Sequence, residues 1–189
     1  AEVCRKYDLW LHVDASWGGA AAFLPHDAPE RSVLAGLENA HSITINPHKL
    51  LGVTHQCSFL LVHDKSVLIP PSHSDGGYLF HVPAEDALDM ATKTLGCGRR
   101  GDALKFYLVW LRYGTQGLGD HIAHGLRMAQ ALWQRLQLIP SLELGPHADP
   151  LFLQICVRPR EQSVRALHAQ LQAHGQFAVD YAPLDDGQE

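Results

Sequence analysis

Three short apolar runs in the first third of the chain have the pattern of buried strands. They cover residues 9–13, 42–45 and 57–62, and turn-forming or helical segments separate them. Runs of this length and composition are typical of strands in a parallel sheet that is covered on both faces. Residues 29–40, between the first two runs, repeat their apolar positions at helical spacing. The pattern therefore predicts a strand, a helix and a strand, and with them an α/β fold.

The middle of the chain changes from a long loop to two helices. Residues 66–101 are rich in proline, glycine and serine, and a loop of this length is uncommon unless it is functional, so we interpret it as a lid. Residues 102–113 are apolar on nearly every helical face and predict a helix buried in the body of the protein. From about Asp120 the apolar residues follow a single stripe, which predicts an amphipathic, half-exposed helix.

The last quarter of the chain has the pattern of a small α+β domain. The predicted strand, strand, helix and strand lie at 142–144, 151–157, 161–174 and 176–181. Because a glycine-rich stretch separates the two preceding helices, we place a domain boundary there. Residues 1–115 are then the later part of a large α/β domain, and residues 116–189 are part of the small domain.

Composition and charge exclude several classes of protein. The 189 residues are 46% hydrophobic and 19% charged, which is typical of a soluble globular protein. A formal net charge of −5 provides no basic field for a nucleic acid, so we expect no such partner. No apolar run approaches the ~18 residues of a membrane span, and the first residues lack the apolar core of a signal peptide. We expect a cytoplasmic protein with no membrane contact, whose four dispersed cysteines are reduced thiols.

Two patterns match the sequence motifs of known sites but lack the neighbouring elements or ligands that those sites need. Residues 96–101 match G-x-G-x-x-G, but no strand precedes them and no βαβ unit follows, so we do not interpret them as a dinucleotide site. His121 and His124 would share one helix face, but no acidic residue or cysteine pair completes a ligand set. We therefore expect no metal site.

An acid and an amine follow two neighbouring predicted strands. Asp14 comes directly after the strand at 9–13, and Lys49 follows the strand at 42–45. Their separation is about one βαβ crossover, so both side chains can reach one pocket at the carboxyl edge of the sheet. This combination fits a pyridoxal phosphate site, in which Lys49 forms the Schiff base and Asp14 is the partner of the pyridinium nitrogen.

Further motifs follow these two in a fixed order. They are His12–Gly19, Asn46–Lys49 with Gln56-Cys57-Ser58, Gly77-Tyr78-Leu79-Phe80, and Cys97-Gly98-Arg99-Arg100 with Asp102 and Lys105. In this order and at these intervals they resemble the group II pyridoxal-phosphate-dependent decarboxylases, within the branch of glutamate, cysteine-sulfinate and related acidic amino acid decarboxylases. The resemblance implies the PLP-dependent transferase-like fold, also called fold type I. It also implies decarboxylation of an acidic L-amino acid (glutamate, aspartate or cysteine sulfinate) to the amine and carbon dioxide.

The resemblance assigns five residues to the cofactor. Lys49 would hold pyridoxal 5'-phosphate covalently until the substrate amine displaces it. Asp14 would keep the ring nitrogen charged, because an adjacent carboxylate raises the pKa of that nitrogen. Asn46 and His48 would contact the phosphate and neighbouring polar groups, and Ser16 would line the ring face.

Two more residues are assigned to the substrate and the reaction. Tyr78, on the long loop, matches the lid tyrosine proposed in relatives to protonate the carbanionic carbon after carbon dioxide leaves. Arg99 would bind a substrate carboxylate with its bidentate guanidinium. A surface arginine before a helix would be disfavoured by the helix dipole, so a functional partner is the better interpretation.

This chain also departs from the family pattern. The family's chains are more than twice as long, and their upstream half supplies the residue that stacks on the pyridoxal ring and much of the phosphate site. Ser16 stands where relatives usually have alanine, and His55 where an apolar residue is commoner. We therefore expect a partial chain that is inactive alone, whereas the full-length parent would be an active homodimer.

Two alternatives stay open at this point. Another fold-type I reaction, such as that of an aminotransferase or a desulfurase, would use a similar acid and lysine, although the Tyr78 and Arg99 motifs argue against it. The chain could also be a truncated, non-catalytic fragment of a decarboxylase.

Overall fold

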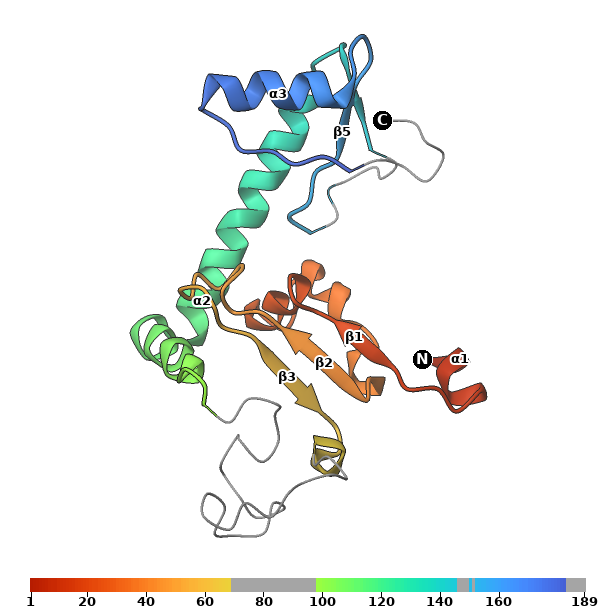
Figure 1. The fold of residues 1–189 in the computed structure, drawn as a ribbon, viewed down its shortest axis with the longest axis vertical. Helices are drawn as coiled ribbons and strands as arrows, with labels where there is room; N and C mark the ends of the chain where they lie inside the picture. Colours follow the sequence, from red (N-terminus) through yellow and green to blue (C-terminus); the bar gives the residue numbers. More distant parts are fainter. Residues whose placement is uncertain (69–97, 146–149, 151, 183–189) are drawn as a thin grey trace. The chain divides into compact units, whose positions relative to one another are not determined.

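The computed structural model describes residues 1–68, 98–145, 150 and 152–182 (Figure 1). The chain divides into two compact units, Ala1–Ile122 and Ala123–Glu189. The division falls inside the long helix α2 (Asp102–Leu136), a few residues beyond the boundary predicted at 115/116. Among the described residues, no helix is long and apolar enough to cross a membrane.

A three-stranded sheet forms the centre of the first unit. Its strands β1 (His12–Asp14), β2 (Ser42–Ile45) and β3 (Phe59–Val62) lie in the order β1-β2-β3 (Figure 1). As predicted, β1 and β2 are parallel, but β3 is antiparallel to β2. A parallel third strand would need a crossover, usually a helix. Residues 46–58 contain no helix, so the chain reverses its direction instead.

The connection between β1 and β2 consists of 3₁₀ turns, and the prediction of a regular helix at 29–40 is wrong. Gly36 interrupts this segment with a φ of 86°, in the left-handed region that favours glycine. Short 3₁₀ turns are common as connectors of this kind. These turns are η1 (Gly18–Phe23), η2 (Pro29–Leu34) and η3 (Leu37–Asn39). The helix α1 (Glu2–Lys6) precedes β1, and η4 (Lys65–Leu68) follows β3.

Small residues let η1 pack closely in the first unit. A Cβ atom on Gly19 would lie 3.0 Å from Cγ1 of Ile45, and one on Gly119 would lie 2.4 Å from the carbonyl oxygen of Phe23. Helix α2 therefore approaches the end of η1 at backbone contact distance. The buried apolar residues of this unit are Ala15, Ala20, Ala21, Leu24, Ala40, Leu51, Val53, Cys57, Leu118 and Ile122.

Helix α2 contains both predicted helices of the middle region, joined at Gly114, whose φ of 66° and ψ of 177° are not helical. The expectation that residues 102–113 are buried is wrong for most of their apolar side chains. Phe106 and Trp110 do pack edge-on against Phe23. The other large apolar side chains are more than half exposed because no described segment covers them: Leu104, Tyr107, Leu108 and Leu111.

The second unit combines the end of α2 with a hairpin-like pair and a short helix. β4 (Leu142–Leu144) and β5 (Val157–Pro159) are antiparallel, and Ser163 caps α3 (Val164–His174) by accepting the N–H of Ala166. Ala129 and Trp133 are buried, which confirms the predicted amphipathic stripe of α2.

Two predicted strands of the second unit are corrected. The segment 151–157 does not form a continuous strand: Phe152 has a φ of 58°, which is incompatible with an extended chain, and β5 begins only at Val157. Residues 176–181 form no strand, and their apolar side chains, such as Phe177, are exposed. An alternating pattern is not enough when no described strand provides a hydrogen-bonding partner.

Candidate active site

Asp14 is the last residue of β1 and lies at the carboxyl edge of the parallel pair. Its Oδ1 accepts a hydrogen bond from the backbone N–H of Ser16 at 2.9 Å. Hydrogen bonding by the Ser16 side chain and backbone, with a further contribution from the positive charge of Lys49, holds the pKa of Asp14 below its ordinary value. The Asp14 carboxylate is therefore charged and held in place at the end of the strand.

Lys49 contacts Ser16 from the turn that follows the other strand of the pair. It lies in the turn after β2, where its backbone N–H donates to the carbonyl oxygen of Asn46 at 3.0 Å. Its Nζ donates to Oγ of Ser16, also at 3.0 Å. Ser16 thus contacts both Asp14 and Lys49, and the structure brings the predicted acid and amine together at one edge of the sheet.

His48 and Asn46 belong to the same turn as Lys49. Nδ1 of His48 accepts the backbone N–H of Cys57 at 3.0 Å, and the imidazole packs edge-on against His55 with 4.6 Å between ring centroids. Oδ1 of Asn46 is buried and has no hydrogen-bond partner among the described residues. A buried polar atom of this kind normally has a partner, so Asn46 has hydrogen-bonding capacity that this part of the chain does not use.

Of the two residues predicted to act on the substrate, the structure describes only Arg99, which has no contact with this cluster among the described residues. Arg99 is exposed and lies three residues before the start of α2. It makes no hydrogen bond or ion pair within the described part of the chain. Tyr78, with most of the predicted lid, lies outside the described residues. The roles of all seven site residues stay predictions.

Sequence reasoning assigned no role to Cys57, which organises the neighbourhood of His48. Cys57 is buried, its backbone N–H is bound by His48, and its Sγ donates to the carbonyl oxygen of Asp102 at 3.4 Å. Burial raises the pKa of this thiol, with a further increase from the charge of Asp102. In the sequence, Cys57 begins an apolar run and belongs to the Gln56-Cys57-Ser58 motif, but neither feature reveals these contacts.

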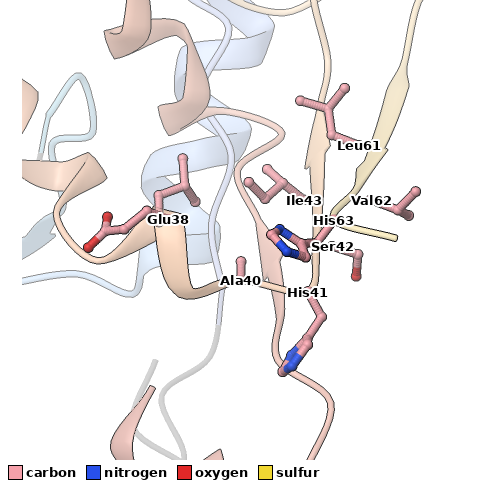
Figure 2. Close-up of a pocket in the computed structure, with 9 residues that line it drawn as sticks. Glu38, Ala40, His41, Ser42, Ile43, Leu61, Val62 and His63 are labelled. Carbon is pink, nitrogen blue, oxygen red and sulfur yellow. The ribbon is translucent and has the colours of Figure 1, made fainter. Parts of the chain in front are cut away.

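A separate pocket lies at the opposite end of the sheet. It has a volume of about 200 Å³ and is open to solvent. Figure 2 shows its lining at the start of β2 and the end of β3, including His41, Ser42 and His63. None of the predicted site residues lines it, and within the described ranges no three His, Cys, Asp or Glu side chains could hold a metal ion. The pocket is therefore not the candidate active site.

The cluster at the carboxyl edge fits pyridoxal phosphate. Lys49 provides an exposed amine for the cofactor's aldehyde, and Asp14 provides a charged carboxylate for a protonated ring nitrogen. Asn46, whose Oδ1 has no partner in the described part of the chain, and the imidazole of His48 add polar groups to the turn that carries the amine. This donor set matches the chemistry of the cofactor.

Known proteins of one family are similar to this chain over most of its length. The family model described as "Pyridoxal-dependent decarboxylase conserved domain" matches residues 1–158. The L-aspartate decarboxylase dtxS4 of Metarhizium robertsii is 43% identical over 155 residues, which cover 82% of this chain and 30% of that protein. Mouse CSAD in apo form is 30% identical with a TM-score of 0.80, over 97% of this chain and 41% of that one. Oryza sativa TDC with PLP and tryptamine is 26% identical with a TM-score of 0.84, over 97% and 40%.

The chain thus spans between 30% and 41% of the length of these relatives. The similarity confirms the predicted fold class, a portion of the fold-type I architecture, and it confirms pyridoxal phosphate as the cofactor of the family. The alignment extends well beyond the few residues of the Asp14 and Lys49 motifs. The chain belongs to the pyridoxal-dependent decarboxylase family.

Proposed function

We propose that the protein carrying this chain removes the α-carboxylate of an acidic L-amino acid, with pyridoxal phosphate as cofactor, and releases the amine and carbon dioxide. The observation that carries this proposal is the contact of one serine, Ser16, with both Asp14 and Lys49. A charged carboxylate and a primary amine are the two groups that this cofactor requires, and their shared contact with Ser16 supports the proposal.

Each residue of the cluster has a distinct task. Lys49 holds the cofactor covalently and releases it to the substrate. Asp14 keeps a positive charge on the ring nitrogen, and its low pKa ensures that the carboxylate is ionised for this purpose. Asn46, His48 and Ser16 orient the cofactor through their polar groups. When bound, pyridoxal phosphate supplies the electron sink that accepts the electrons of the broken carbon–carbon bond.

An acidic substrate is supported by the relatives and by Arg99. The curated relative reported above is an L-aspartate decarboxylase. Arg99 is exposed, and its guanidinium has no partner among the described residues, so it can bind a substrate carboxylate in bidentate fashion. We assign Tyr78 the protonation of the substrate carbon after decarboxylation. We further propose that the protein is a cytoplasmic homodimer; the exposed apolar side chains near the start of α2 support the dimer.

Reduction with borohydride tests the cofactor site. The intact protein, loaded with pyridoxal phosphate and reduced, should carry the label on the peptide that contains Lys49. Label on Lys65, Lys93 or Lys105 would overturn the assignment of Lys49.

Release of carbon dioxide tests the reaction and its substrate. The intact protein should form it from at least one of aspartate, glutamate and cysteine sulfinate. Transfer of the amino group to a keto acid, or loss of sulfur without decarboxylation, would replace the proposed reaction by another of the same fold type. In the Tyr78→Phe variant, release of carbon dioxide should persist while part of the substrate is diverted to an aldehyde and leaves its amino group on the cofactor. An unchanged product would remove Tyr78 from the protonation step.

A further inference from the structure

Two segments that are far apart in the sequence are joined beside the candidate site. One is the segment 56–57, which follows the Lys49 turn, and the other is the first turn of α2. Nζ of Lys105 donates to the carbonyl oxygen of Gln56 at 2.6 Å and forms an ion pair with Oδ1 of Asp102 at 2.9 Å. Sγ of Cys57 donates to the carbonyl oxygen of Asp102. We call these contacts the Lys105 link.

The Lys105 ammonium is the centre of this link. It contacts a backbone carbonyl on one segment and a carboxylate on the other, and both charged side chains are largely shielded, with 29% of Lys105 and 22% of Asp102 exposed. Hydrogen bonds to charged groups are shorter and stronger than neutral ones. Loss of the ammonium would leave the Gln56 carbonyl and the Asp102 carboxylate without this partner, so the two segments would separate more easily.

The link continues from the segment 56–57 to His48. The backbone N–H of Cys57 donates to Nδ1 of His48, and the backbone N–H of His48 lies 3.4 Å from the carbonyl oxygen of Cys57. The position of Cys57 therefore sets the position of the imidazole, which is adjacent in the chain to Lys49. On its other side, the first turn of α2 follows Arg99 by three residues.

We propose that Lys105 is a positioning residue of the active site: by holding the segment 56–57 against the start of α2, it orients His48 and fixes the cofactor turn relative to the segment that carries Arg99. This rests on the proposed function for the identity of the ligand, but the contacts do not depend on it. Lys105 touches neither Asp14 nor Lys49 in the structure and acts only through Gln56, Cys57 and Asp102.

The test compares Lys105→Met with Arg112→Met in the intact protein. Both changes remove one positive charge from α2, but Arg112 is exposed and lies over the ring of Tyr113, away from the link. We expect Lys105→Met to weaken pyridoxal phosphate binding roughly tenfold, as loss of a charge-assisted hydrogen bond can do. Arg112→Met should bind the cofactor as wild type does, and Lys105→Arg should recover most of the loss.

A second experiment measures the accessibility of His48 and requires neither bound cofactor nor catalytic turnover. Modification of the apoprotein by diethyl pyrocarbonate, followed by peptide mass spectrometry, should be faster at His48 in Lys105→Met than in wild type and unchanged in Arg112→Met. If this rate changes while no variant decarboxylates any amino acid, the proposed function fails and the positioning role stands. Unchanged cofactor binding and unchanged modification in Lys105→Met, or equal effects in Arg112→Met, would overturn the proposal. If Lys105→Met fails to fold, the shorter and uncharged variant Lys105→Gln replaces it, and the same two measurements on that variant decide the proposal.

Discussion

At the scale of single residues, the site depends on a serine at the position where the family pattern usually has alanine. Ser16 donates its backbone N–H to Asp14 and accepts a hydrogen bond from Lys49. A small apolar residue could make only the first of these contacts, because the second needs a side-chain oxygen. In this chain Ser16 therefore connects Asp14 and Lys49 through contacts within the protein itself.

The effect of the Ser16 hydroxyl on the pKa of Asp14 should be measurable by titration. Because the pKa of Asp14 is lowered in the folded state, its carboxylate stabilises the fold above the unfolded-state pKa, and this contribution is lost as the pH falls through the folded-state value. Ser16→Ala removes the side-chain bond but keeps the backbone bond, so the pKa of Asp14 should rise toward its ordinary value, and the stability that this carboxylate contributes and loses on acidification should become smaller. The carboxyl NMR shift of Asp14 against pH measures this.

A matched control exists elsewhere in the same unit. Ser66 hydrogen-bonds Asp64 through its backbone and side chain and lowers the pKa of that carboxyl in the same way. Ser66→Ala should raise the pKa of Asp64 and leave Asp14 unaffected. If Ser16→Ala leaves the titration of Asp14 unchanged, the hydroxyl is not the cause of the low pKa.

Asp14 itself should matter more for the reaction than for cofactor affinity. Asp14→Asn keeps a polar group of similar size but removes the charge that keeps the ring nitrogen protonated. We expect the decarboxylation rate of the intact protein to fall by a larger factor than the affinity for pyridoxal phosphate. Turnover close to that of wild type in this variant would exclude Asp14 from the proposed role.

At the scale of elements, the site depends on how tightly α2 packs against the 3₁₀ turn that follows β1. Gly119 lies where any side chain would meet the backbone of Phe23. The first half of the same helix, with Asp102 and Lys105, contacts the segment that carries Cys57. Packing of the helix and geometry of the site are therefore coupled.

Gly119→Ala tests this packing, because the sign of the change in the free energy of unfolding depends on how closely α2 approaches Phe23. In an open helical position the change would stabilise the protein by about 1 kcal/mol, because alanine has the higher helix propensity. Here the new Cβ would lie 2.4 Å from the carbonyl oxygen of Phe23, and overpacking of this kind typically costs about 1–3 kcal/mol. We expect net destabilisation in urea unfolding of the intact protein.

Gly18→Ala provides the comparison for that experiment. Gly18 begins η1, and a Cβ atom there would have no neighbour within 4 Å. Its substitution should change the free energy of unfolding very little. Stabilisation by Gly119→Ala would show that α2 does not approach η1 as closely as the structure indicates.

At the scale of the whole molecule, the described chain leaves much apolar surface and two strand edges without partners. Within the described residues, β1 and β3 each pair only with β2. Large apolar side chains of α2 are exposed beside Phe106 and Trp110. Unpaired edges and apolar patches are sites of association. Such exposed surface is expected of a chain that covers less than half the length of each of the three relatives described above.

We therefore predict that the 189-residue chain expressed alone has no measurable decarboxylase activity and tends to aggregate. The purified chain can be assayed with aspartate, glutamate and cysteine sulfinate in the presence of pyridoxal phosphate, and its size followed by light scattering. Turnover of any of the three substrates by a monodisperse sample would contradict this prediction.

The sequence by itself determined the parts of this protein that follow from local patterns. Apolar runs placed β2 correctly and put Asp14 at the end of one strand and Lys49 in the turn that follows its neighbour. Because strands that are joined by a crossover in one sheet end at the same edge, their convergence could be predicted without coordinates. The stripe of Ile122, Ala129 and Trp133 similarly predicted which face of α2 is buried.

Only the tertiary structure decided the features that depend on distant segments. The direction of β3, the exposure of the first half of α2 and the absence of a strand at 176–181 depend on which partners are nearby, and an apolar pattern does not specify them. The contact between Ser16 and Lys49 and the link from Lys105 to Gln56 join residues more than thirty positions apart. Side-chain hydrogen bonds at such separations leave no periodic signal in the sequence, because they arise only when the packed elements bring donor and acceptor within about 3 Å of each other.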